Sequence, residues 1–300
     1  MKKFHSVAHF HLPGLFEFYD FYREFLPLFY SHREYFYDWC EISSIYGSPQ
    51  DCLWGGGRVE NGTASEKDVF SLLNEFSISA RLTFSNSLLK KEHLSDKKCN
   101  LLCKLFNDSK TQSGIIVHSE ALLEYLKKNF SGFYFVSSTT KVLTDFKDFL
   151  AELNRPDFSF VVPDFRLNKD FKNLFSLSME QKNKVEFLCN ECCAFNCHDR
   201  KSCYESVSKK NLGLEANHKC TAQDLGQGYK FSKAMKNPGF IGLSDIQNIY
   251  LPNGFSNFKI EGRGLGSALI LEFLLYYLTK PEYQLNVREE IYLSNSLDLF

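Results

Sequence analysis

Short apolar runs recur along this chain, and most are followed by a segment in which apolar residues repeat at helical spacing. The runs are rich in Val, Ile and Phe and are bounded by polar or turn-forming residues, which is typical of strands. They predict about eight strands, at residues 5–11, 41–46, 80–84, 115–118, 133–136, 158–162, 185–188 and 258–261. The segments between them predict helices at residues 15–29, 66–76, 121–129, 144–153 and 267–278.

Regular alternation of strand and helix predicts a parallel sheet, because each pair of parallel strands needs a crossover connection. With about eight such units, the expected fold class is α/β, as a single (β/α)8 barrel of the TIM type over residues 1–300. Residues 189–255 break this rhythm, because they are polar and rich in cysteine. We call them the cysteine-rich insertion, and we expect them to form a metal-binding loop after the seventh strand.

The composition is that of an ordinary globular chain. Of its 300 residues, 44% are apolar and 24% are charged, and the formal net charge is −1. Proteins that bind the phosphate backbone of nucleic acids usually carry an excess of positive charge. The pI of about 6.7 shows no such excess, so we expect a small-molecule substrate and no nucleic acid. The start has no secretory signal and no apolar run is long enough to span a bilayer, which predicts a cytoplasmic protein without a membrane span.

Polar residues follow the ends of the predicted strands. In α/β barrels the chemistry lies at the carboxyl ends of the strands, so these residues form the expected site. The residues expected to contact substrate or transfer protons are Glu191, Lys259, Glu261 and Arg263. The residues expected to bind substrate are Arg58, Lys141, Asp164 and Arg166. The basic side chains suit a carboxylated substrate, and ion pairing with nearby acids is the structural alternative.

A glycine-rich stretch, GRGLGSA at residues 262–268, follows the last predicted strand and opens a helix. Backbone N–H groups at such a helix start can bind phosphate or carboxylate. Close packing of the helix on the strand is the alternative reason for the glycines. The stretch is not the dinucleotide-binding fingerprint, because its third glycine falls one position early.

Five of the 10 cysteines lie within residues 189–203. In the cytoplasm, where disulfides are rare, clustered cysteines more often bind metal or do redox work. Structural zinc usually takes two close cysteine pairs, and no clean second pair is present, so the spacing favours an iron–sulfur cluster over zinc or free thiols. The expected ligands are Cys193, Cys197, Cys203 and Cys220, with Cys189, Cys192 and Cys52 as alternatives.

Two stretches resemble a known family. The run NECCAFNCHDRKSCY, residues 190–204, looks like the cysteine motif of the collagenase-like peptidase superfamily. Residues 243–263, LSDIQNIYLPNGFSNFKIEGR, resemble the segment of that family in which a helix leads into a strand ending in KIEGR. The resemblance is specific from about residue 185 to residue 263 and diffuse before it, where YGSP and GGGR look like a loop after an early barrel strand.

The resemblance implies an α/β barrel and, as in the better understood members, a four-iron cluster held by cysteines. Those members support oxygen-independent hydroxylation of a ubiquinone precursor or of bases in transfer and ribosomal RNA. We therefore expect an oxidoreductase, an iron–sulfur-dependent hydroxylase or related enzyme, acting on a small organic substrate. A non-catalytic scaffold stabilised by its metal and a peptidase are the alternatives. Relatives that act in pairs imply a paired family subunit or a homo-oligomer.

The chain departs from the family pattern at three points. Fewer residues separate Cys193 from Cys197 than usually separate the first two ligands, and Cys203 stands where a shorter variant of the motif often has His. Cys192 is an extra thiol beside a presumed ligand, and it can either replace that ligand or act as a redox partner. The identity of the ligands is therefore less well defined than the presence of a metal centre.

Overall fold

The computed structural model describes residues 7–56, 62, 64–191, 193–220 and 229–297. Within them, one sheet of eight parallel strands has the order β6-β5-β4-β3-β2-β1-β8-β7. The strands are β1 (Ala8–Pro13), β2 (Cys40–Gly47), β3 (Ser79–Phe84), β4 (Gly114–Val117), β5 (Tyr134–Ser137), β6 (Phe160–Val161), β7 (Glu186–Leu188) and β8 (Asn257–Lys259).

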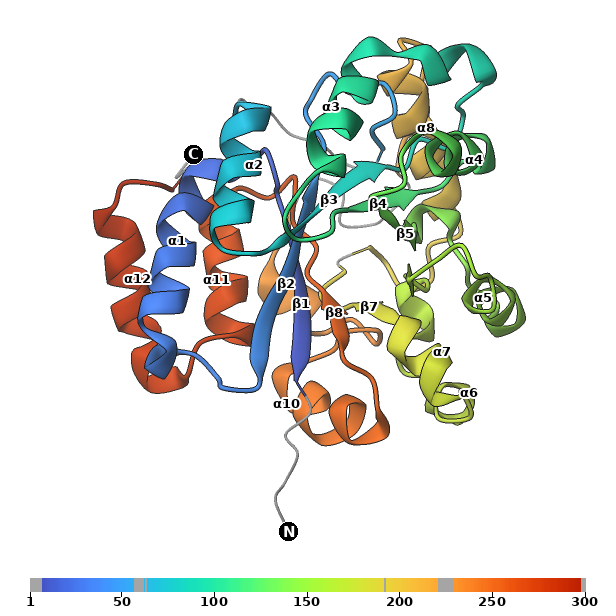
Figure 1. Ribbon diagram of the computed structural model, residues 1–300. Coiled ribbons are helices and arrows are strands. Elements are labelled where there is room, and N and C mark those ends of the chain that lie inside the picture. The colour runs from blue at the N-terminus through green and yellow to red at the C-terminus, as the bar shows by residue number, and fades with distance from the viewer. Residues whose placement is uncertain (1–6, 57–61, 63, 192, 221–228, 298–300) are drawn as a thin grey trace.

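Helices connect successive strands and surround the sheet (Figure 1). Those of at least eight residues are α1 (Tyr19–Ser31), α2 (Glu66–Glu75), α3 (Lys97–Asn107), α4 (Glu120–Asn129), α5 (Phe146–Leu153), α8 (Arg200–Asn211), α11 (Ser267–Tyr277) and α12 (Gln284–Leu293). The shorter ones are α6 (Phe171–Leu174), α7 (Met179–Lys184), α9 (Phe231–Ala234) and α10 (Leu243–Asp245). Within the described part of the chain, every helix is too short or too polar to cross a bilayer.

The sheet curls into a nearly closed barrel. Its outer strands, β6 and β7, meet at one parallel bridge between Val161 and Val185. This seam is short because β6 has two residues and β7 has three. The predicted fold class, an α/β barrel of the TIM type, is confirmed.

Side chains that point into the barrel form two layers, because inward positions recur at every second residue of a strand. Toward the carboxyl ends, an apolar cluster fills the lumen: Tyr46, Ile116, Val136, Val162 and Leu188. Two residues earlier on β7, the lumen holds the buried carboxylate of Glu186, and Arg81 reaches it from β3. The barrel therefore has an apolar ring above a charged floor.

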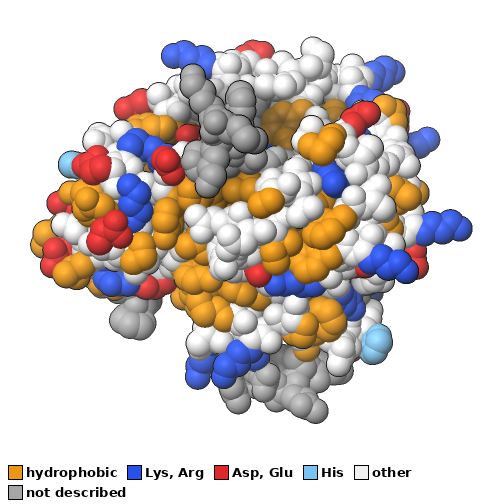
Figure 2. Space-filling model, turned by 90° about the horizontal axis from the view of Figure 1, so that it is seen from below, with side chains coloured by type: hydrophobic (Ala, Val, Ile, Leu, Met, Phe, Trp, Pro, Cys, Tyr) orange, Lys and Arg blue, Asp and Glu red, His pale blue; other side chains and the backbone are white. Residues whose placement is uncertain are grey.

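Aromatic residues pack between the strands and the outer helices. On α1, Phe21, Phe25 and Phe29 recur every fourth residue, so they share one helix face, and all three are buried. Their rings stack in sequence and contact Phe36 after the helix. Seen from the side on which β1 begins, apolar side chains gather near the middle of the face and charged ones lie around its edge (Figure 2).

The helices of at least eight residues differ from the prediction at four places. α1 begins at Tyr19 and not at residue 15, because Gly14, with a φ of 92°, turns the chain sharply after β1. α8 lies inside the cysteine-rich insertion and was not predicted, since its sequence RKSCYESVSKKN is polar almost all round. α3 and α12 also lie outside the predicted ranges. Residues 5 and 6 of the first predicted strand lie outside the described residues.

Candidate functional site

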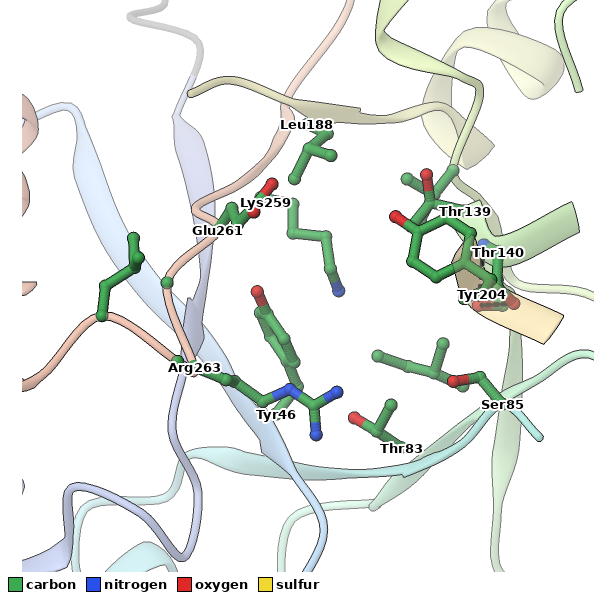
Figure 3. A pocket seen from close by; sticks show the side chains of 16 residues that line it. Tyr46, Thr83, Ser85, Thr139, Thr140, Leu188, Tyr204, Lys259, Glu261 and Arg263 are labelled. Carbon is green, nitrogen blue, oxygen red and sulfur yellow. Dashed lines mark hydrogen bonds between the residues drawn. The ribbon is translucent and has the colours of Figure 1, made fainter. Parts of the chain in front are cut away.

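A cavity of about 280 Å³ lies at the carboxyl ends of the strands. This volume is near the lower limit for small-molecule sites, which usually measure about 300–1,000 Å³. Side chains from β2, β3, β8 and α8 point into it (Figure 3). Its polar lining residues are Tyr46, Thr83, Ser85, Ser138, Thr139, Thr140, Tyr204, Lys259, Glu261 and Arg263.

Glu186 is the centre of the charged floor below the cavity. Its carboxylate is fully buried, forms an ion pair with Arg81, and lies 3.3 Å from Nζ of Lys259. Burial alone would raise the pKa of Glu186, but the charges of Arg81 and Lys259 outweigh it and hold that pKa well below its usual value. Glu186 is therefore a permanent anion, and it serves as the counter-ion of the cations around it.

Lys259 connects this floor to the cavity. Its Nζ lies 3.6 Å from the ring centroid of Tyr46, which is a cation–π contact. Tyr46 is fixed in turn, because its hydroxyl donates to the backbone oxygen of Ile260 at 2.7 Å. Burial, with the positive charges of Arg81 and Arg263, lowers the pKa of Lys259 to about 8. The amine is therefore charged at neutral pH and able to release its proton just above it.

His11 on β1 contributes a neutral imidazole to the floor. Its Nδ1 is hydrogen-bonded to the Ser44 hydroxyl at 2.8 Å, and its Nε2 lies 3.7 Å from Glu186. Burial, followed by the charge of Arg81, lowers the pKa of His11 well below its usual value. Since Nε2 has no hydrogen-bond partner among the described residues, His11 adds a polar atom to the lumen without adding charge.

Arg263 provides the second cation of the cavity. It follows β8, and its guanidinium donates to the backbone oxygen of Gly56 at 2.7 Å and to the Ser48 hydroxyl at 3.4 Å. Its Nη1 also lies 3.7 Å from the buried carboxylate of Glu17. The turn after β2 therefore sets the position of this side chain.

Three hydroxyl groups on the cavity wall have no hydrogen-bond partner within the described part of the chain. They belong to Thr83, Ser85 and Thr139. A buried hydroxyl without a partner costs about 1–3 kcal/mol, so such groups call for a partner from elsewhere. Together with Lys259 and Arg263, they form a wall that suits a small ligand carrying negative charge and hydrogen-bonding atoms.

A chain of buried ion pairs joins the cysteine-rich insertion to the barrel. Arg200 lies 2.6 Å from Glu191 and 3.3 Å from Asp164, and all three are almost fully buried. Glu191 also accepts a hydrogen bond from the Cys193 backbone at 2.9 Å. Arg166 pairs with Asp164 and donates to the backbone oxygen of Cys197 at 2.8 Å. These contacts fix the backbone on which two predicted metal ligands lie.

The predicted metal-binding thiols make separate contacts. Burial, followed by the charge of Glu191, raises the pKa of Cys193 to about 12, and Cys197 is near enough to add to this shift. Cys203 Sγ lies 2.9 Å from His218 Nε2. Among the residues that the structure describes, no three His, Cys, Asp or Glu side chains come together as a metal site.

Within the described part of the chain, the four predicted cysteine ligands do not converge on one point. The fourth predicted ligand, Cys220, is half-buried. Of the alternatives, Cys189 and Cys52 are buried, and Cys192 lies outside the described residues. The iron–sulfur cluster and its ligand set therefore stay predictions.

The structure brings only part of the predicted substrate site to the cavity. Lys259, Glu261 and Arg263 line it, whereas Glu191, Asp164 and Arg166 form the ion-pair chain beside it. Lys141 is held by Glu152 at 2.6 Å and by Glu120 at 3.3 Å. Arg58 lies outside the described residues. The predicted roles of these residues stay predictions.

Several residues of the cavity and of the charged floor below it were missed in the sequence. Arg81 and Glu186 are charged residues within predicted apolar strands. Each lies two residues before a cavity-lining residue, Thr83 or Leu188, and this spacing indicates that it faces the barrel lumen. Tyr204 comes from α8, whose presence in the insertion had no apolar periodicity to indicate it. The GRGLGSA stretch does border the cavity, through Gly262, Gly264 and Leu265.

Comparisons with known proteins agree on the fold and go no further. No family model matches the sequence, and no curated protein matches it. The solved structure of the U32 peptidase Mk0906 is similar in fold, with a TM-score of 0.52 and 13% sequence identity. The similarity covers 88% of this chain and 96% of that one. At the level of fold, the chain is thus similar to this U32 peptidase.

Proposed function

We propose that this protein is a barrel enzyme that binds a small anionic organic substrate in the cavity, beside a metal centre in the cysteine-rich insertion. The proposal depends on one observation. Two buried cations share a cavity wall with hydroxyls that have no hydrogen-bond partner among the described residues. Lys259 and Arg263 supply the charge, and Thr83 and Ser85 supply two of the hydroxyls. A carboxylate or phosphate suits such a wall, because charge-assisted hydrogen bonds are stronger than neutral ones.

The side chains divide the chemical work in this proposal. Arg263 orients the anionic group, since its guanidinium is fixed by backbone and hydroxyl acceptors. Lys259, with a pKa of about 8, binds the anion as an ammonium and can return a proton to the substrate. Glu186 stays ionised and holds Lys259 in place. Part of the apolar ring also lines the cavity and offers the substrate an apolar surface.

The metal centre is proposed from the cysteine spacing and the family resemblance. Cys193, Cys197, Cys203 and Cys220 are its proposed ligands, and the cluster would supply the electron transfer for an oxygen-independent hydroxylation. The ion-pair chain of Arg200 supports this proposal, because its members hold the backbone of Cys193 and Cys197. Arg200 itself lies 5.2 Å from the ring centroid of the cavity residue Tyr204.

Ligand binding tests the proposed cavity. Small carboxylates and phosphate monoesters are titrated into anaerobically purified protein, and binding is followed by calorimetry. We expect one class to bind, and we expect Lys259→Met to weaken that binding at least tenfold. The matched control is Lys147→Met, at an exposed position of α5, which leaves binding unchanged. Equal binding by the Lys259 variant would exclude this cavity as the anion site.

A second experiment tests the proposed metal ligands. Visible absorption and electron paramagnetic resonance spectra are compared between the anaerobic Cys197→Ala and Cys40→Ala variants. Cys40 is a fully buried core cysteine near the Tyr277 backbone, so its loss controls for a missing thiol. We expect the cluster signal to vanish only in the Cys197 variant. A full signal in that variant removes Cys197 from the ligand set.

Peptide hydrolysis is the second candidate function. The 2.9 Å contact between Cys203 and His218 favours it, because a cysteine hydrolase needs a thiol beside an imidazole. The fold likeness to a U32 peptidase is consistent with it, although the cavity is small for a folded protein substrate. Hydrolysis of fluorescent gelatin, lost in Cys203→Ser and kept in Cys40→Ser, would replace the redox proposal.

A further inference from the structure

Two buried thiols outside the cysteine-rich insertion lie next to each other. Cys52 is in the turn after β2, and Cys99 is in the first turn of α3. Their Sγ atoms are 3.0 Å apart, about 1 Å more than the roughly 2.05 Å of a disulfide bond. Cys52 is 3% exposed and Cys99 is fully buried. A small movement of either segment is therefore enough to join the two sulfurs.

The surrounding backbone keeps the two thiols together. Cys99 N donates to the Asp96 side chain at 2.8 Å, which caps α3. Cys52 is held in its turn by hydrogen bonds to the backbones of Pro49 and Gly55. The neighbours of the two cysteines, Asp51 and Lys98, form an ion pair. This arrangement fixes the thiol pair from both sides.

A third thiol, Cys103, lies one turn further along α3 and is fully buried. Cys99 lies within reach of a group formed on the Cys52 sulfur, because the two sulfurs are 3.0 Å apart. Cys52 is the less buried member of the pair, so the first oxidation is assigned to it.

The turn that carries Cys52 also shapes the cavity. The backbone oxygen of Gly56 and the hydroxyl of Ser48 both accept hydrogen bonds from Arg263. The backbone oxygen of Gly55 accepts another from Asn211 at the end of α8, at 2.7 Å. A covalent link at Cys52 therefore acts on a segment that holds both the cavity cation and the helix of the cysteine-rich insertion.

We propose that Cys52 and Cys99 form a reversible disulfide that locks the turn at residues 48–56 onto α3. With hydrogen peroxide as oxidant, Cys52 is first oxidised to a sulfenic acid, and one water is released. The Cys99 sulfur then attacks this group, so that the S–S bond forms and a second water leaves. The two thiols lose two electrons and two protons in total, and the peroxide takes them up.

Peptide mapping of the full chain tests this inference. The protein is treated with hydrogen peroxide, alkylated under denaturing conditions, digested without reduction and analysed by mass spectrometry. We expect a peptide pair cross-linked through Cys52 and Cys99, which dithiothreitol separates. We also expect a rise in Tm of roughly 5 °C or more on oxidation, because the closed loop is long. Amides of residues 50–56 should exchange more slowly in the oxidised protein.

Variants separate this disulfide from other oxidations. Cys52→Ser and Cys99→Ser should lose both the cross-link and the rise in Tm, whereas Cys40→Ser should keep both. Two results of peptide mapping on the wild-type chain after peroxide would overturn the inference. In one, Cys52 and Cys99 are both alkylated, and in the other, Cys52 is cross-linked to Cys103. Neither the detection of the cross-link nor the measurement of Tm requires a bound metal or a substrate, so this test is independent of the proposed function.

Discussion

The barrel lumen and the cysteine-rich insertion both contain buried charges, but they use them differently. In the lumen, Glu186 neutralises Arg81 and Lys259 within a closed wall of strands. In the insertion, Arg200 joins Glu191 to Asp164 and so holds a long connection against the barrel rim. Removing a charge should therefore affect the whole fold in the lumen and one segment in the insertion.

The two regions also differ in how complete their sites are. The lumen places its cations and hydroxyls around one cavity with a defined volume. In the insertion, the described thiols contact separate partners, such as His218 for Cys203. The proposed substrate site is thus preorganised by the strands, whereas the proposed metal site requires its cysteines to be drawn together.

The largest expected effect is that of Glu186→Gln. This change leaves Arg81 buried without its counter-ion, and breaking a buried pair usually costs about 3–5 kcal/mol. We expect the free energy of unfolding in urea to fall by that amount. The matched control is Glu272→Gln, which breaks a half-exposed pair with Arg288 and should cost less than about 1 kcal/mol. Equal losses would show that the lumen network does not stabilise the fold.

A smaller, local effect is expected for Arg200→Leu. The change leaves the Glu191 and Asp164 carboxylates without their shared cation, at a cost of about 2–3 kcal/mol. Local opening of the insertion relieves this cost, so amides of α8 should exchange faster while those of β3 do not. Lys201→Leu, at the next and exposed position, is the control. Uniformly faster exchange across the barrel would contradict the contrast between the two regions.

The protonation of Lys259 should make stability depend on pH. Its pKa is about 8 in the folded protein and 10.5 without perturbation, so the unfolded chain binds more protons between these values. The free energy of unfolding should therefore rise with pH, by about 1–2 kcal/mol from pH 8 to about pH 9.5, relative to Lys259→Met. If the free energy of unfolding of the two proteins had the same pH dependence, the pKa of Lys259 would not be lowered in the folded protein. Binding of an anion should weaken over the same pH range.

The smallest effect on stability is expected for Thr83→Val. The Thr83 hydroxyl is buried without a partner among the described residues, so removing it should change the free energy of unfolding by less than about 1 kcal/mol. Anion binding, in contrast, should weaken severalfold in calorimetry, because the ligand loses a hydrogen bond. A loss of stability without any loss of binding would assign this hydroxyl to the fold.

The sequence was sufficient to predict the barrel, because strands and helices alternate strictly from β1 to β6. It also predicted Lys259, Glu261 and Arg263 at the cavity, since residues at the end of a barrel strand meet at one rim. It did not predict that Asp164 would pair with Arg200, because this contact depends on how the insertion folds back. A polar helix such as α8 has no periodic pattern from which that path follows.

The most direct test of the account is the metal content of the full chain after anaerobic purification. Iron, acid-labile sulfide and zinc are measured on the same sample and compared with the protein concentration. The account predicts about four iron and four sulfide per chain, as a 4Fe-4S cluster requires, and little zinc. Stoichiometric zinc without iron would contradict the redox proposal and would favour a metal-stabilised scaffold.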